Sequence, residues 1–120
     1  MTIPSGTGTE VLKRATSLGT TNNLNSLTTV LTVASNHIYT VLKIVVSENG
    51  SASELLTIKV TDADQSDQSV DLLINQPITS NETFIWGHKF VLDSGDLLRF
   101  QTGSASNMDI HISYIDQDWS

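Results

Sequence analysis

The chain of 120 residues contains no cysteine and few basic residues. Without cysteine it can form neither disulfide bonds nor thiolate metal sites. The cysteine count therefore does not indicate whether the protein works in an oxidising or a reducing compartment. Its 13 Asp and Glu outnumber its six Lys and Arg and give a net charge of −7, which argues against nucleic-acid binding. No apolar run is long enough to cross a bilayer, and residues 1–8 lack the features of a signal peptide. We expect neither nucleic acid nor a membrane among its partners.

The motifs of common catalytic and cofactor sites are also missing. The seven glycines form neither a phosphate-binding loop nor a dinucleotide-binding motif. His37, His88 and His111 lie in different segments, and no spacing brings two of them to one metal ion. The Ser and Asp residues of segment 93–96 have no histidine within reach in the sequence. We therefore expect a protein without catalytic residues, cofactor or enzyme activity.

Ser and Thr are abundant instead, with 30 of the 120 residues, and apolar side chains alternate with polar ones along most of the chain. A period of two is typical of half-buried strands. The alternation predicts strands at residues 27–33, 38–46, 55–61, 70–74, 83–86, 90–92, 97–101 and 108–114, with a weaker candidate at residues 10–15. We count these as about eight strands and expect no helix.

The alternation also predicts which side chains enter the core. Residues 38–46 place Ile38, Thr40, Leu42, Ile44 and Val46 on one face, and residues 55–61 place Leu56, Ile58 and Val60 on another. Tyr39 falls on the less apolar face of its strand. Phe84, Trp86, Phe100 and Tyr114 fall on apolar faces and are expected in the core.

Short polar segments separate the strands, among them residues 75–77 and 93–96, which carry turn-forming Asn, Asp and Gly. Short strands between polar turns predict an all-β fold, a single antiparallel β-sandwich with jelly-roll or Greek-key connections. The periodicity does not choose between these two connections. We expect a flexible N-terminal arm at residues 1–26 that contains the strand candidate, a sandwich domain at 27–116 and a C-terminal tail at 117–120.

The acidic segment between two predicted strands is the best candidate for a metal site. Asp62, Asp64 and Asp67 are close in sequence, and carboxylate oxygens are ligands that Ca²⁺ prefers. The segment lacks the glycine and the later Glu of an EF-hand loop. A solvated hairpin loop, whose charges discourage aggregation of sheet edges, is the preferred interpretation, so no metal site is assigned.

The N-terminal arm is rich in Thr, Ser, Gly and Asn, so we expect it to fold poorly alone and to order on a binding partner. The predicted partner-binding residues are Ile3, Val11, Leu12, Lys13, Arg14 and Leu18 in this arm, together with Trp119. An exposed tryptophan is unfavourable, so the ring of Trp119 is expected to dock either on its own sandwich or on a neighbouring molecule.

The order of segments resembles the small β-sandwich structural proteins encoded among the virion genes of tailed bacteriophages. The resemblance rests on residues 8–14, 35–46, 78–83, 90–101 and 103–114, and it extends from Glu10 to Ile115. These residues are mostly turn and core residues, so they indicate the fold more strongly than the role. The resemblance brings no catalytic residues. It implies a protein that decorates heads, sits at connectors or joins tails and fibres.

Two classes of function follow. The first is a virion component, assembled in the host cytoplasm, that acts as a capsid decoration or cement protein on the major capsid protein or another virion protein; a tail, neck or fibre-associated role is its variant. The second is a carbohydrate- or calcium-binding recognition module, carried by the acidic segment and the aromatic residues. Exposed sheet edges and sparse charge also predict a homo-oligomer.

Overall fold

The computed structural model describes residues 8–20, 22, 24–103 and 107–119, and almost all of its regular structure is β. The described strands are β1 (Thr9–Ser17), β2 (Thr28–Thr32), β3 (His37–Glu48), β4 (Glu54–Asp62), β5 (Gln68–Ile78), β6 (Thr83–Trp86), β7 (Phe90–Leu92), β8 (Leu97–Thr102) and β9 (Met108–Asp118). The one helical turn among the described residues is the 3-10 turn η1 (Ala63–Gln65), so none of them forms a helix able to cross a membrane. The predicted all-β class is confirmed.

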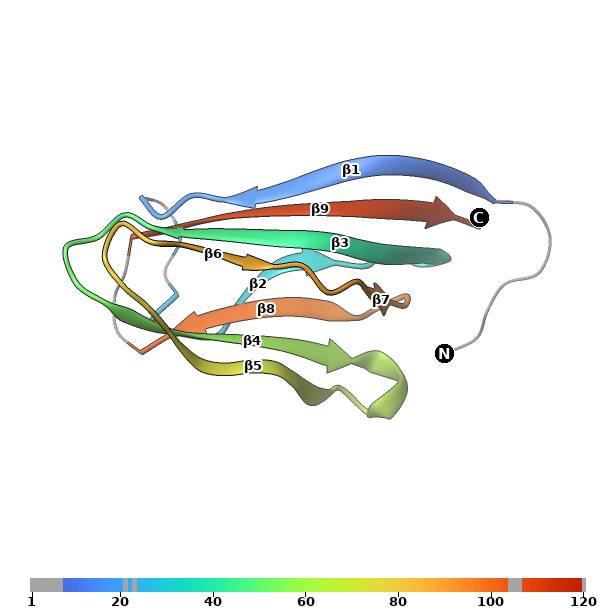
Figure 1. Cartoon of the computed structure of the whole chain (residues 1–120). Coiled ribbons are helices and arrows are strands. Elements are labelled where there is room, and N and C mark those ends of the chain that lie inside the picture. Colours follow the sequence, from blue (N-terminus) through green and yellow to red (C-terminus); the bar gives the residue numbers. More distant parts are fainter. Residues whose placement is uncertain (1–7, 21, 23, 104–106, 120) are drawn as a thin grey trace.

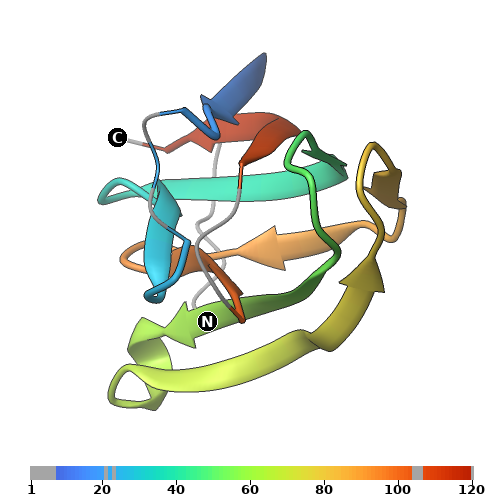
Figure 2. The ribbon, with the colours of Figure 1, turned by 90° about the vertical axis from the view of Figure 1, so that its left-hand side faces the viewer.

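The strands form two antiparallel sheets that pack face to face (Figures 1 and 2). One sheet has the order β1-β9-β3-β6, with β7 also paired to β3, and the other has the order β2-β8-β4-β5. Since β6 and β7 pair with successive stretches of β3 and are separated only by residues 87–89, they act as one interrupted strand. The eight strands counted in this way follow jelly-roll order, so the predicted sandwich is confirmed and its connections are those of a jelly roll.

The core lies between the sheets and follows the alternation of the strands. Leu56 and Ile58 of β4 are fully buried, and Val60 is 9% exposed, as the sequence predicts. The facing sheet contributes Ile110 and Ile112 from β9, which are also buried. Alternate residues of these strands point outward, as the pleat of a strand requires.

The prediction for the first half of β3 is wrong, because a bulge changes its phase. The register between β3 and β9 shifts between Val41 and Lys43, so one extra residue is accommodated at Leu42. Before the bulge, Tyr39 and Val41 enter the core and Thr40 does not, while Ile38 is buried, at 7% exposed, outside the main core cluster. After it, Ile44 and Val46 are buried as predicted. Leu42 is left on the outer face.

Residues 9–17, expected as a short strand within a flexible arm, form β1 and pair with β9 along their whole length. Leu24 is fully buried in the core, and its carbonyl oxygen accepts a hydrogen bond from Thr102 N at 2.7 Å. The described part of the predicted arm therefore lies within the sandwich, because β1 pairs with β9 at the edge of the sheet and Leu24 packs in the core. At the other end β9 continues to Asp118, past the expected boundary at residue 116.

Candidate functional site

The predicted partner-binding residues Val11, Leu12, Lys13 and Arg14 all lie in β1, at the edge of the five-stranded sheet. The strand turns alternate side chains to opposite faces. Ala15 packs against the core, so Val11 and Lys13 share the inner face, and Leu12 and Arg14 point outward. The structure thus divides a group that the sequence presents as one.

Lys13 belongs to a charged cluster on the inner face of the five-stranded sheet. Its Nζ donates a hydrogen bond at 2.7 Å to Oδ2 of Asp116, a residue of β9 that is only 3% exposed. His37 Nδ1 of β3 lies 2.6 Å from Oδ1 of the same carboxylate. Burial acts to raise the pKa of Asp116, but the hydrogen bonds from Lys13 and His37 outweigh burial and hold that pKa below its usual value. The cluster joins β1, β9 and β3, so it is structural.

The outer face of the same sheet carries exposed apolar side chains in two rows. Leu12 of β1 pairs with Ile115, which pairs with Thr40, which pairs with Val91 of β7, so these four side chains form one row across the sheet. A second row contains Thr16, His111, Val45 and Ile85, and a row of Arg14, Ser113 and Lys43 lies between the two. The exposed fractions are 72% for Leu12, 49% for Val91 and 57% for Ile85. We define the apolar face as the apolar residues of the two rows together with Thr40, which lies within the first row. Its members are Leu12, Thr40, Val45, Ile85, Val91 and Ile115.

Two shallow hollows mark the apolar face. The larger, of about 540 Å³, is lined by Leu12, Leu42 and Arg14, among others. The smaller, of about 200 Å³, lies between the end of β1 and β3 and includes Leu18 and Val45. The sequence places Leu18 among the partner-binding residues, and the structure brings it to the border of the same face as Leu12.

Basic side chains lie beside these hollows. Arg14 of β1 and Lys43 of β3 both pair in register with Ser113 of β9, one from each side. Neither forms an ion pair with a described residue. On a chain of net charge −7, positive charge therefore lies between the two rows of the apolar face.

The other two predicted partner-binding residues lie elsewhere. Trp119 docks on its own sandwich: its backbone N donates to Asn36 O at 2.9 Å, and its ring lies so close to Gly8 that a Cβ there would approach ring carbon Cδ2 to 2.9 Å. Of the two outcomes predicted for Trp119, the structure shows the intramolecular one. Ile3 lies outside the described residues.

The acidic segment does not gather its carboxylates into a ligand set. Asp62 Oδ1 accepts a hydrogen bond from Asp64 N at 2.9 Å and so caps η1. Asp96, which is 6% exposed, accepts hydrogen bonds from the backbone of Ala63 and Asp93, and it ties η1 to the turn before β8. The described residues contain no group of three or more His, Cys, Asp or Glu side chains that could hold a metal ion, so Asp62, Asp64 and Asp67 form no such site.

The aromatic residues offer no exposed platform. All seven lie within the described residues. Three are buried, and Phe84, Trp86 and Phe90 pack against the core. The sequence correctly assigns Phe84, Trp86, Phe100 and Tyr114 to the core.

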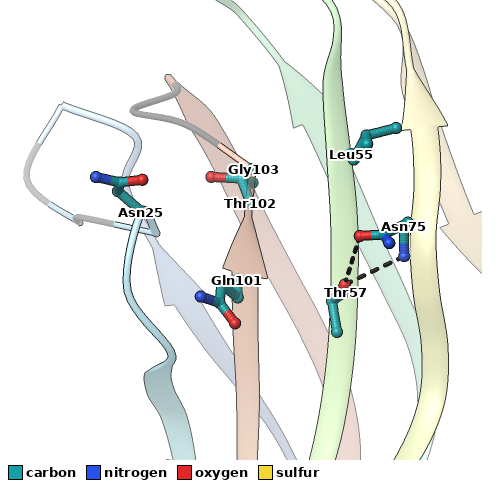
Figure 3. A pocket seen from close by; sticks show the side chains of 7 residues that line it. All are labelled: Asn25, Leu55, Thr57, Asn75, Gln101, Thr102 and Gly103. Carbon is teal, nitrogen blue, oxygen red and sulfur yellow. Dashed lines mark hydrogen bonds between the residues drawn. The ribbon is translucent and has the colours of Figure 1, made fainter.

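A polar hollow on the outer face of the four-stranded sheet has no counterpart among the sequence predictions (Figure 3). It has a volume of about 240 Å³, and its polar lining includes Asn25, Thr57, Asn75 and Gln101. Leu55 adds an apolar wall. These residues come from four different segments, so only the pairing of β8, β4 and β5 brings them together. The residue that could have indicated this hollow from the sequence is Asn75, which is predicted in a turn but lies inside β5.

The fold is shared with solved structures at low sequence identity. A protein of the Bacillus endospore appendages, which form disulfide-linked pili, gives a TM-score of 0.59 at 11% identity and covers 100% of this chain and 97% of that chain. A chain of the T13 IBDV viral particle gives a TM-score of 0.55 at 9% identity and covers 91% of this chain and 31% of that chain. A pentameric capsid protein from metagenomic phage sequences gives a TM-score of 0.40 at 15% identity, over 92% of this chain and 59% of that chain.

No protein-family model and no curated protein sequence matches the chain. The first two of these solved structures share the β-rich fold of this chain; one comes from a pilus and the other from a viral particle. This chain spans about a third of the viral chain and nearly the whole of the appendage protein. At these identities the likeness establishes the fold and nothing finer.

Proposed function

We propose that this protein is a non-enzymatic structural subunit of a virion, and that it decorates the head by docking its apolar face on the major capsid protein. The observation that carries the proposal is the exposure of Leu12, Ile85 and Val91 on one face of the five-stranded sheet. Exposed apolar side chains that gather on one face mark sites of protein association. The role places the protein in the virion, after assembly in the host cytoplasm.

The charges beside the apolar face support a protein partner of defined chemistry. Arg14 and Lys43 carry positive charge without a described ionic partner, so they favour a partner surface that places acidic residues between apolar ones. Specific interfaces combine apolar side chains with a few charged ones, and arginine is enriched in them. The occurrence of the same fold in a viral particle agrees with this role.

Co-sedimentation with intact, undecorated heads of the source particle tests the proposal. We expect saturable binding at a fixed ratio to the capsid lattice, which Leu12→Asp weakens at least tenfold by placing a charge on the apolar face. Ile74→Asp is the matched control, because Ile74 is 61% exposed but lies in β5 of the other sheet. Removal of residues 1–26 is not a useful variant, since it deletes β1 and the buried Leu24.

The outcomes separate the related roles. Absence of binding to heads, or equal binding by Leu12→Asp and the wild type, contradicts docking through the apolar face. Binding to isolated tails instead moves the protein to the tail, neck or fibre-associated role.

A self-assembling filament subunit is the second candidate, favoured by the mutual coverage with the endospore appendage protein. This chain contains no cysteine, so any filament would form without the disulfide links described for those pili. Filaments seen by electron microscopy in concentrated pure protein would support this candidate, and persistent monomers or small oligomers would contradict it.

A further inference from the structure

We propose that the polar hollow on the four-stranded sheet binds one unit of a neutral saccharide. The hollow lies on the sheet opposite to the apolar face, so a subunit docked through β1 and β3 would still present it to solvent. The inference goes beyond the structural role and does not depend on it. In this arrangement one sheet attaches the protein and the other recognises a glycan.

The hollow is built by residues that hold one another in place. The hydrogen bond from Thr102 N to Leu24 O, at 2.7 Å, fixes the turn that carries Asn25 beside the end of β8. Thr57 of β4 is 9% exposed, and its Oγ1 accepts a hydrogen bond from Asn75 N at 3.1 Å and donates one to Asn75 Oδ1 at 3.5 Å. Figure 3 shows Asn25 and Gln101 on one side of the hollow and Asn75 on the other.

A strained bulge positions Asn75. The register between β4 and β5 shifts between Leu56 and Ile58, and Asn75 adopts a φ of +50°, which is unusual for a residue other than glycine. Bulges aim individual side chains and are frequent next to binding sites, where strained backbone also gathers. The bulge therefore turns the Asn75 amide toward β8, where Gln101 lies.

The donor set selects an uncharged ligand with hydroxyl groups. No Asp, Glu, Lys or Arg lines the hollow. Each amide offers both a donor and an acceptor, which matches hydroxyl groups that also donate and accept. The Gln101 amide and the Asn75 amide nitrogen have no hydrogen-bond partner among the described residues. Leu55 is 43% exposed and provides a wall for the C–H groups of a sugar ring.

An extended peptide does not fit this place. A peptide that adds to a sheet needs the unpaired backbone groups of an edge strand. Here β8 pairs with β2 and β4, and β4 pairs with β8 and β5, so neither is an edge. The volume of about 240 Å³ is also below the range of sites for drug-sized ligands, which agrees with a ligand of one ring.

Titration of the ¹⁵N-labelled full chain with single neutral sugars tests the inference. The panel contains glucose, galactose, mannose and N-acetylglucosamine, each followed in the side-chain amide signals of Asn25, Asn75 and Gln101. We expect at least one sugar to shift these signals saturably, and to leave the Gln117 amide of β9 unchanged. A panel in which no sugar shifts them overturns the proposal.

Substitutions make the assignment specific. Gln101→Leu removes an amide at similar size, and Asn75→Gly removes an amide while tolerating the positive φ. Each is expected to weaken sugar binding about tenfold, because one hydrogen-bonding group is lost. Gln68→Leu in β5, outside the hollow, is the control and should bind as the wild type does. Binding by Gln101→Leu at wild-type strength overturns the site, whereas loss of head binding bears only on the structural role.

Discussion

The ammonium group of Lys13 in β1 donates a hydrogen bond to the carboxylate of Asp116 in β9, with 2.7 Å between Nζ and Oδ2. This contact crosses the first strand pair of the five-stranded sheet, where β1 has a neighbour on one side only. It lies on the inner face of β1, so Leu12 and Arg14, at alternate positions, lie on the outer face. The apolar face and this charged contact thus occupy opposite sides of the same strand.

Asp116→Asn should lower the free energy of unfolding by about 1–3 kcal/mol, since it removes the charge that Lys13 and His37 contact in a nearly buried place. Denaturant unfolding measures the change. Asp71→Asn is the matched control: the Lys59–Asp71 pair spans 3.5 Å and is partly exposed, so its loss should cost less than about 1 kcal/mol. Equal effects of the two substitutions would contradict the role given to Asp116.

The stability of the wild type should fall on acidification below pH 4. The pKa of Asp116 is lower in the folded protein than its usual 3.8, so the unfolded chain binds this proton first as the pH falls. The contribution of Asp116 is complete above pH 4 and is lost as the pH falls through the folded pKa. In unfolding curves measured from pH 6 to pH 2, the difference between wild type and Asp116→Asn should shrink with falling pH. A constant difference would count against the charged contact.

Gly19→Ala should destabilise the protein by about 1–3 kcal/mol, because its Cβ would lie 2.5 Å from Met108 N and 2.2 Å from Asn107 Oδ1. Gly19 N also donates to Asp109 Oδ1 at 2.7 Å, a contact that the displaced chain would lose. Gly87→Ala is the control, since nothing lies within 4 Å of its added Cβ. Thermal unfolding of both variants provides the comparison, and an unchanged Tm for Gly19→Ala would refute this packing.

Replacement of Leu12 or Val91 by Ser should change the free energy of unfolding by less than about 1 kcal/mol, since both side chains are largely exposed. Ile44→Ala, at a fully buried position of β3, should cost about 2–5 kcal/mol. Denaturant unfolding of the three variants separates a binding surface from the core. A large loss of stability in Leu12→Ser would show that this side chain supports the fold.

The sequence predicts the β-sandwich because alternation is a local property that survives wherever strands are regular. Leu56, Ile58 and Val60 follow it without interruption. Tyr39 departs from the prediction because the bulge at Leu42 is a feature of strand pairing, and no single strand reveals it. Asn75 departs for the same reason: an Asn two residues before a proline is typical of a turn, and its partner Thr57 lies on another strand.

The sequence predicts the apolar face only in part, and it does not predict the polar hollow. Leu12 and Arg14 are predicted to bind a partner, as apolar and basic residues of a polar segment, and the structure leaves both side chains exposed. Their association with Val91 and Lys43 arises from pairings between β1, β9, β3 and β7, which join residues far apart in the chain. The polar hollow requires the turn before β2 beside β8, β4 and β5. The apolar face and the polar hollow therefore both arise from the register of several strands, and not from the residue types of one segment.

The position of β9 also governs when this molecule can fold. The strand fills the gap between β1 and β3, so Thr9 meets Asp118, and His37 meets the same residue from the other side. During synthesis, β1 and β3 have no shared neighbour until residues 108–118 have left the ribosome. Folding dominated by such distant pairings is slow, and unpaired strands are prone to aggregate in the interval. Folding of the five-stranded sheet therefore waits for β9, and a chain that stops before residue 108 lacks the strand that joins β1 to β3.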